Sequence, residues 1–212
     1  MKTLVVANQK GGVSKTTTTA HLAVAAAGEG KRTCIIDADP QGSLSDWWND
    51  RAAEDIQLLQ CKVHEISSIV GRLADQFDLL VIDTPPGTGA EVAGLVRLGD
   101  FVLIPVRPSP HDLRAVPGTL SLLDGQPFAF VLSQAKGRAS ITLQAVAALS
   151  EHGTVARAVI GDRVDFASAM IDGRTVGEID PRGKAAEEVA ALWTWVRDRL
   201  WIKETKKKKV EV

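Results

Sequence analysis

The sequence has few cysteines, almost no excess charge and no long apolar run, and each shortage excludes a class of protein. Only two cysteines, Cys34 and Cys61, occur among 212 residues, and both lie in apolar segments. A disulfide scaffold is therefore excluded, and both thiols are expected to be reduced. The formal net charge is -1, so total charge indicates no partner and only local clusters are informative. No apolar run approaches a membrane span, and the one at the N-terminus is too short for a signal peptide, so we expect a cytoplasmic protein.

What the chain does contain is a regular alternation of short apolar runs with longer amphipathic segments. Hydrophobic residues make up 45% of the sequence, enough for the core of one α/β domain, expected over residues 1–203. The basic segment 204–212 is expected to be a disordered tail. Strands are expected at 3–7, 33–37, 56–61, 78–83, 100–106, 128–133 and 154–159, and helices at 15–28, 63–76, 111–123, 140–151 and 187–203. The alternation predicts an α/β fold, a doubly wound, mostly parallel sheet with helices on both faces and a ligand at the carboxyl ends of its strands.

Residues 9–17 lie between the first expected strand and the first expected helix, which is the context that a phosphate loop needs. Backbone N–H groups and the start of a helix point at an anion there. Gly11 and Gly12 let the backbone approach without obstruction. Lys15 is placed to reach the phosphates of a nucleotide, and the Thr16 hydroxyl is placed to bind Mg²⁺.

The strict pattern G-x-x-x-x-G-K-[ST] is not met, because Gln9 and Ser14 occupy its two glycine positions. Taken alone, the segment therefore also fits an ordinary glycine turn that opens a helix.

Three ordered segments resemble the ParA/MinD family of P-loop ATPases. Residues 10–17, K-G-G-V-S-K-T-T, match its deviant Walker A box, K-G-G-x-x-K-[ST]-[ST]. Residues 37–41, D-A-D-P-Q, are similar to its switch I, and residues 80–87 are similar to its Walker B strand and switch II. The likeness extends over about residues 1–200, through 102–109, 173–176 and 180–186. It implies a P-loop NTPase that hydrolyses ATP with Mg²⁺.

The resemblance also assigns roles to individual residues. It implies catalytic roles for Lys15, which neutralises phosphate charge, for Asp39, which positions the attacking water, and for Lys10, which reaches the nucleotide of a partner subunit. The metal ligands it implies are Thr16, Asp37 and Asp83, the last through water. Contacts to the nucleotide are expected from Gly11, Gly12, Val13, Ser14, Lys15, Thr16 and Thr17, and contacts to adenine from Pro181 and Arg182, near Ser133 and Gln134. Most relatives carry glycine where Ser14 stands; because serine resists a positive φ, slower hydrolysis or weaker binding is expected.

Basic residues are concentrated in the last third of the chain. The family likeness implies an ATP-bound homodimer that binds DNA without sequence preference, which requires charge but no base-reading constellation. A solvated helix face followed by a solubilising tail is the plainer interpretation of the same residues. The candidate DNA contacts are Arg163, Arg174, Arg197, Arg199 and Lys203.

Further alternatives concern the partner and the cargo. A MinD-like protein would place the apolar face of its last helix, including Leu192, Trp193 and Val196, on a membrane; packing of this face onto the sheet is preferred here. Trp47 and Trp48 form either part of a surface for an activating protein or the packing of a helix. The cargo is a plasmid, a chromosome or a protein organelle such as a carboxysome, reached through an adaptor protein, with the ATPase on the nucleoid. A relative of the nitrogenase iron protein and a scaffold that does not hydrolyse ATP are the alternatives outside this class.

Overall fold

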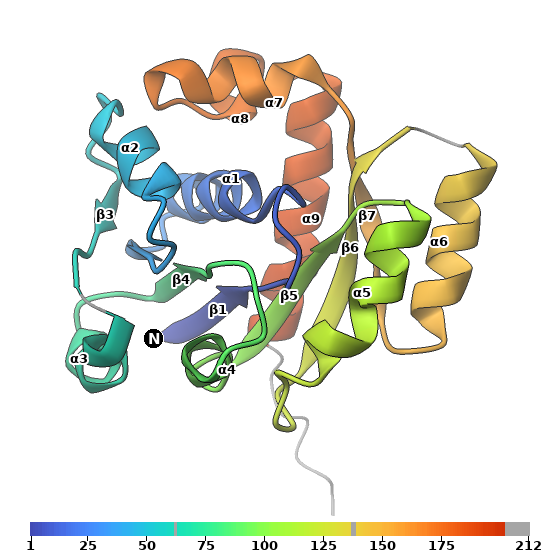
Figure 1. The fold of residues 1–212 in the computed structure, drawn as a ribbon. Coiled ribbons are helices and arrows are strands. Elements are labelled where there is room, and N and C mark those ends of the chain that lie inside the picture. Colours follow the sequence, from blue (N-terminus) through green and yellow to red (C-terminus); the bar gives the residue numbers. More distant parts are fainter. Residues whose placement is uncertain (62, 137–138, 202–212) are drawn as a thin grey trace, which may run out of the picture.

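A single seven-stranded sheet forms the centre of the protein (Figure 1). The computed structural model describes residues 1–61, 63–136 and 139–201. The strand order is β3-β2-β4-β1-β5-β6-β7, and every pair of neighbouring strands is parallel. The strands are β1 (Lys2–Val6), β2 (Thr33–Asp37), β3 (Ile56–Leu58), β4 (Leu79–Asp83), β5 (Phe101–Val106), β6 (Phe128–Ala135) and β7 (Val155–Gly161). All seven expected strands are present, and the predicted α/β fold is confirmed.

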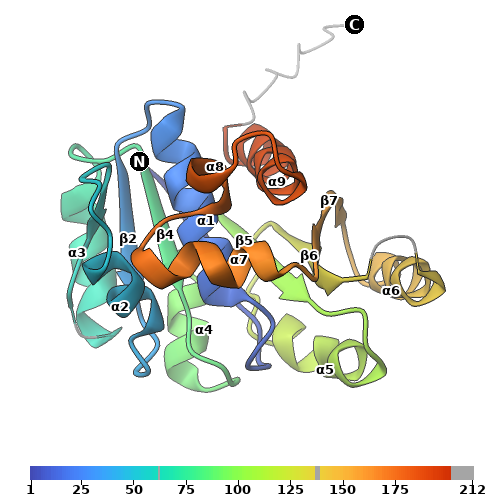
Figure 2. The same cartoon turned by 90° about the horizontal axis from the view of Figure 1, so that it is seen from above.

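Helices cover both faces of the sheet (Figure 2). The long helices α1 and α9 lie on one face, and α3, α4, α5 and α6 lie on the other. The helices are α1 (Lys15–Gly28), α2 (Ser43–Asn49), α3 (Ile66–Leu73), α4 (Ala90–Val96), α5 (Pro110–Leu120), α6 (Ser140–Ser150), α7 (Val164–Ala169), α8 (Val176–Ile179) and α9 (Lys184–Leu200), with short 3-10 turns η1 (Val63–Glu65) and η2 (Met170–Asp172). The sequence did not predict α2, α4, α7 or α8, because helices of four to seven residues are too short to show a helical period.

The core is divided between the two faces of the sheet. Along β1, Leu4 and Val6 pack toward α1 and α9, whereas Val5 packs toward the opposite helices, as the alternation of side chains along a strand requires. The apolar residues of α9 belong to the half of the core that also contains Leu4, Val6 and α1. Trp193 is 1% exposed and Val196 is completely buried. The face of α9 that a membrane would need is therefore covered by the protein's own core, in agreement with the preferred interpretation. No helix among the described residues is long and apolar enough to cross a membrane.

The register of the sheet brings the ends of three strands together. Asp83, the last residue of β4, lies opposite Val6 of β1 on one side and opposite Asp37 of β2 on the other. The loop that follows β1 thus begins beside both aspartates. A ligand held by this loop lies at the carboxyl edge of the sheet, which is where parallel α/β folds bind their ligands.

Candidate nucleotide-binding site

The loop between β1 and α1 adopts the conformation of a phosphate loop. Gly12 and Ser14 both have left-handed backbones, with φ of 71° and 68°. Glycine takes this conformation without cost, whereas serine is strained by it. The loop leads directly into α1, whose free N–H groups and positive dipole end favour an anion.

The end of β6 braces this strained loop. Ser133 donates a hydrogen bond from Oγ to the Val13 carbonyl at 2.9 Å. The amide nitrogen of Gln134 donates to the Gly12 carbonyl at 2.9 Å and to the Ser14 hydroxyl at 2.8 Å. Gln134 also has a left-handed backbone, with φ of 49°. Ser14 therefore adopts the left-handed conformation that favours glycine, and its hydroxyl accepts a hydrogen bond that glycine cannot form. Its effect on turnover stays a prediction.

Asn8 fixes the start of the loop, and the sequence analysis missed it. Its buried side chain donates to the Pro105 carbonyl at 2.7 Å and accepts from the Lys10 N–H at 2.9 Å. Thr119 of α5 donates its hydroxyl to the same Asn8 oxygen at 3.2 Å and accepts from the Gln9 N–H. The only sequence signal for this residue is a polar amide at the end of an apolar strand.

Lys15, Thr16 and Asp83, three of the predicted site residues, lie together. The Thr16 hydroxyl donates to Asp83 Oδ2 at 2.6 Å, and Lys15 Nζ donates to the Lys10 carbonyl at 3.1 Å. Lys15 is 7% exposed. Burial lowers the pKa of its ammonium group, and the negative charges of Asp83 and Asp39 oppose the shift.

The Asp83 carboxylate fits a cation site. Its Oδ1 is buried and has no hydrogen-bond partner among the described residues. Burial raises the pKa of this carboxyl to about 7, while the hydrogen bond from Thr16 lowers it. A buried oxygen without a partner is costly unless a ligand satisfies it. Hard oxygen donors such as this carboxylate and the Thr16 hydroxyl suit Mg²⁺ and would hold it here, where its charge would neutralise that of the nucleotide's phosphates.

The two aspartates of switch I have different surroundings. Asp37 accepts the backbone N–H of Asp39 at 3.1 Å and that of Ser45 at 2.8 Å, so its carboxylate holds the first turn of α2. The Asp39 carboxylate accepts the Gln41 N–H at 3.0 Å, its one hydrogen bond within the described part of the chain, and its charge acts on Lys15. A catalytic role fits the freer carboxylate of Asp39. The metal role of Asp37 and the catalytic role of Asp39 both remain predictions.

The other candidate nucleotide contacts lie outside the cluster formed by Lys15, Thr16 and Asp83. Lys10 is exposed at the crest of the loop, and its ammonium group has no ion-pair partner among the described residues. Thr17 lies in the first turn of α1, where its carbonyl interacts with the His21 ring. Pro181 and Arg182 are exposed just before α9, and no described hydrogen bond joins them to the phosphate loop. Their contact with adenine stays a prediction.

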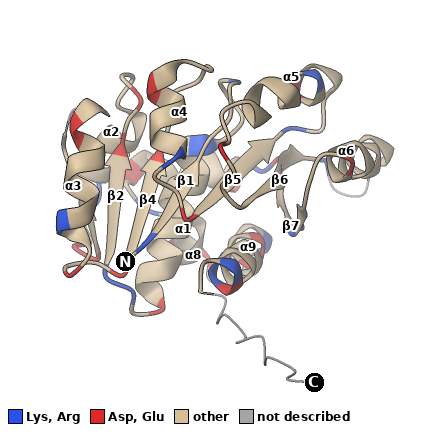
Figure 3. Cartoon of the chain, turned by 90° about the horizontal axis from the view of Figure 1, so that it is seen from below, with Lys and Arg blue, Asp and Glu red and all other residues tan. Residues whose placement is uncertain are grey.

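The arginines proposed to contact DNA are engaged within the protein. Figure 3 shows acidic positions among the basic ones on α9. Arg163 pairs with Glu188 at 2.7 Å, Arg174 with Asp172 at 2.6 Å, and Arg197 with Glu29 at 3.0 Å. The guanidinium of Arg199 lies 3.2 Å from the centre of the Trp195 ring. These pairs reduce the local excess of positive charge, and the DNA contacts remain predictions. Lys203 lies outside the described residues.

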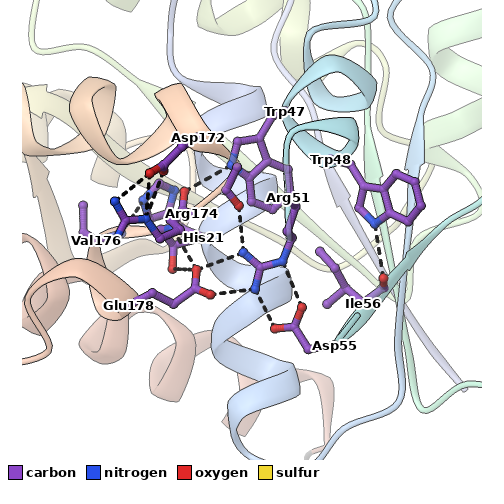
Figure 4. A network of polar contacts seen from close by, with 12 residues as sticks. His21, Trp47, Trp48, Arg51, Asp55, Ile56, Asp172, Arg174, Val176 and Glu178 are labelled. Atoms are coloured by element: carbon purple, nitrogen blue, oxygen red, sulfur yellow. Dashed lines mark hydrogen bonds and ion pairs between the residues drawn. The ribbon is translucent and has the colours of Figure 1, made fainter. Parts of the chain in front are cut away.

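A polar network ties α2 to the segment before α8 (Figure 4). Arg51, whose side chain is 1% exposed, pairs with Asp55 at 2.7 Å and with Glu178 at 2.8 Å, and donates to the Gly173 carbonyl. Trp47 donates its indole N–H to the Arg174 carbonyl at 3.1 Å.

The second tryptophan of α2 is also engaged. Trp48 donates to the Ile56 carbonyl at 3.2 Å. Trp47 is 3% exposed and Trp48 is half-buried. The two tryptophans therefore pack α2, the second of the two alternatives considered for them.

Comparison with known proteins agrees with this geometry. Residues 4–176 match the family described as "CobQ/CobB/MinD/ParA nucleotide binding domain". The chain belongs to this family. It is a ParA-like ATPase, its nucleotide is ATP and its metal is Mg²⁺.

Curated relatives of this ATPase match over nearly their whole length. A "Maintenance of carboxysome distribution protein A" from Gloeobacter kilaueensis is 33% identical and covers 94% of each chain. The protein of the same name from Halothiobacillus neapolitanus is 29% identical, over 88% of this chain and 91% of its own. The "Chromosome-partitioning ATPase Soj" from Thermus thermophilus is 28% identical, over 94% and 97%.

Solved structures confirm the fold. An McdA–ATP complex from Cyanothece has a TM-score of 0.81 at 18% identity, covering 96% of this chain and 98% of the other. MinD with Mg-ADP from Pyrococcus horikoshii has a TM-score of 0.79 at 18% identity, covering 96% and 99%. Members of this family form dimers and bind partner proteins or DNA. For this chain, partners are established in these general terms and not as individual molecules.

Proposed function

We propose that this ATPase positions a cargo in the cytoplasm by a cycle of DNA binding and release. ATP joins two subunits across their phosphate loops, and the dimer binds nucleoid DNA without sequence preference. An adaptor protein on the cargo stimulates hydrolysis, and the ADP-bound subunits leave the DNA. Because ATP binds the associated state, the nucleotide and the dimer stabilise one another.

The observation that supports this proposal is the group of candidate nucleotide-site residues gathered at one edge of the sheet. Lys15, Thr16 and Asp83 lie in contact or in close electrostatic range, and Lys10 is exposed beside them. Relatives named for carboxysome distribution and chromosome partitioning match over almost the full chain. Both kinds of name concern the placement of a large object, so the cargo is a plasmid, a chromosome or a protein organelle such as a carboxysome.

Replacement of Lys15 by alanine tests the nucleotide site. Lys15→Ala is expected to remove most of the affinity for MgATP measured by calorimetry, because it deletes the buried cation beside the phosphates. Asp39→Ala is the matched variant: it is expected to bind MgATP and hydrolyse it much more slowly. Wild-type affinity in Lys15→Ala would disprove the site.

DNA binding is tested by separating the folded arginines from the basic tail. Binding of duplex DNA is measured with and without a slowly hydrolysed ATP analogue and across a range of salt concentrations. A dimer that contacts several phosphates should lose affinity steeply with salt, because each contact adds roughly 0.9 to the log–log slope. Charge reversal at Arg197 and Arg199 is compared with deletion of residues 206–209. Binding that ignores ATP would contradict the proposed cycle, and loss only on deletion would assign the DNA contact to the tail.

The cargo is identified in the cell. A fluorescent fusion of Asp39→Ala is expected to remain on the nucleoid and to leave the cargo badly spaced, because the variant cannot complete the cycle. Spacing of plasmids, chromosome origins or protein organelles is scored in the same cells. Normal spacing of all three would contradict the positioning role.

A further inference from the structure

Arg107 presents a guanidinium edge to the phosphate loop. It is the first residue after β5, the strand beside β1. Arg107 donates from Nε and from one terminal nitrogen to the two oxygens of Asp112, both at 3.1 Å. Its other terminal nitrogen has no hydrogen-bond partner among the described residues and lies 3.9 Å from the place where a Cβ on Gly12 would stand. The unpaired edge of the guanidinium therefore faces the loop.

The buried carboxylate of Asp112 fixes the position of this guanidinium. Asp112 is 2% exposed, whereas the Arg107 side chain is 38% exposed, so the carboxylate is the buried anchor and the arginine is its accessible end. A two-point pair of this kind holds the plane of the guanidinium and not only its charge. Ser109 also donates its hydroxyl to Asp112 and accepts the Asp112 N–H, so the first turn of α5 is already capped without Arg107.

The surroundings of Arg107 favour an anion. Arg107, His111 and Lys136 line one groove together with Gln134, the residue that braces the phosphate loop. A second groove lies beside it, lined by Lys10, His111 and Arg114. Among the described residues, Asp112 is the only acidic residue that lines either groove, and Arg107 neutralises it.

We propose that Arg107 contacts a phosphate group of the bound nucleotide and that Asp112 positions it for this contact. The inference rests on the nucleotide site assigned above. It adds a further cation to that site besides Lys10 and Lys15, and it comes from the strand on the side of β1 opposite Asp83. The phosphate belongs either to the nucleotide of the same subunit or to that of the partner across the dimer; both offer the same oxygens to the free N–H groups.

The experiment must separate phosphate contact from neutralisation of a buried carboxylate. Arg107→Ala leaves Asp112 buried without its cation and is expected to lower stability as well as ATP affinity. The double variant Arg107→Ala/Asp112→Asn removes the uncompensated charge and should regain stability. Arg97→Ala, which removes an exposed arginine paired with Asp124, is the matched control.

Affinities for MgATP and MgADP are measured by calorimetry on dilute monomer, and dimerisation is measured by light scattering with a slowly hydrolysed ATP analogue. If Arg107 contacts the nucleotide of its own subunit, MgATP affinity falls about tenfold in the stable double variant, since a charged hydrogen bond contributes that order of discrimination. A smaller loss for MgADP would assign the contact to the terminal phosphate of ATP, and an equal loss without a change in melting temperature would assign it to a phosphate that ADP retains. If it contacts the partner's nucleotide, monomer affinity is unchanged and dimerisation falls instead.

Wild-type affinity and wild-type dimerisation in the double variant would overturn the proposal and leave Arg107 as a countercharge for Asp112. Equal losses for ATP and ADP that follow the melting temperature would also overturn it. Lys15→Ala distinguishes failure of the nucleotide-site assignment from failure of the role proposed for Arg107. If Lys15→Ala does not weaken ATP binding, the site itself is wrong; if it does and the Arg107 variants bind normally, only the role of Arg107 is wrong.

Discussion

His21 is a buried histidine whose ring is fixed at both nitrogens. Its Nδ1 lies 2.8 Å from the Thr17 carbonyl, and its Nε2 accepts the Val176 N–H at 3.2 Å. These partners require a neutral ring that carries its proton on Nδ1. The ring also packs edge-on against Phe166, at 5.2 Å. His21 therefore links the helix of the phosphate loop to the start of α8.

Acid should destabilise the protein through His21. Burial lowers the pKa of its imidazole to about 4, whereas the unfolded chain binds this proton near pH 6.5. The unfolded state thus gains the proton first, and stability falls as the pH drops from about 6.5 to about 4, by about 3 kcal/mol in total. Urea unfolding at several pH values measures the loss. His21→Gln should flatten the dependence in this window, and an unchanged slope in that variant would contradict the assignment.

Substitutions of Ser14 test whether the hydrogen bond from Gln134 offsets the strain of its left-handed backbone. Ser14→Ala keeps the left-handed strain and loses the bond from Gln134, so it should destabilise the protein by about 1 kcal/mol and weaken ATP binding. Ser14→Gly loses the same bond but also the strain, so it should be near neutral. Denaturant unfolding and calorimetry compare the two variants. Equal behaviour of the alanine and glycine variants would show that strain at this position is unimportant.

At the scale of elements, the turn before α8 depends on a glycine. Gly173 has φ of 73°, and a Cβ built on it would lie 2.3 Å from the backbone nitrogen of Arg51. The Gly173 carbonyl also accepts a hydrogen bond from the Arg51 guanidinium. A side chain here would push η2 and α8 away from the end of α2 and break the network of Figure 4.

Gly173→Ala should therefore be strongly destabilising. Left-handed strain and a backbone clash together cost about 3 kcal/mol, which should lower the melting temperature of a chain of this size by roughly 6–12 °C. Gly177→Ala is the matched control, because Gly177 lies in α8 with open space around it and without a positive φ. Calorimetry of both variants measures the difference. Similar melting temperatures would mean that α2 and the turn separate at little cost.

At the scale of the whole molecule, Lys10 is the residue expected to join two subunits. It is exposed and without an ion-pair partner in the described part of the chain, so its removal should leave the fold intact. Lys10→Ala should keep most of the affinity for ATP and lose most of the dimer formed with a slowly hydrolysed analogue, as measured by light scattering. Lys15→Ala should lose both properties. A full dimer population in Lys10→Ala would exclude a contact across the interface.

Several features were predictable because they depend on neighbours in the chain. The seven strands follow from largely apolar segments of five to seven residues in the sequence. The phosphate loop follows from Gly11, Gly12 and Lys15 at short spacing between a strand and a helix. The family resemblance implied that Asp83 and Thr16 belong to one site, and their contact in the structure agrees with the rule that ligands bind at the carboxyl edge of a parallel sheet. Short helices such as α2 and α8 were missed because they are too short to show a helical period in the sequence. Tertiary contacts of Trp47 and Arg51 hold them in place.

Order along the chain thus determines the sheet, the nucleotide loop and the family, since each arises from local spacing and alternation. Tertiary structure alone decides which side chains brace or neutralise one another. Gln134 and Ser14 are 120 residues apart, and Arg197 and Glu29 are 168 apart. No local pattern encodes such pairs, because they depend on how twisted strands and helices meet in space. This is why a basic segment in the sequence becomes a set of ion pairs in the fold, and why Arg107 faces the phosphate loop.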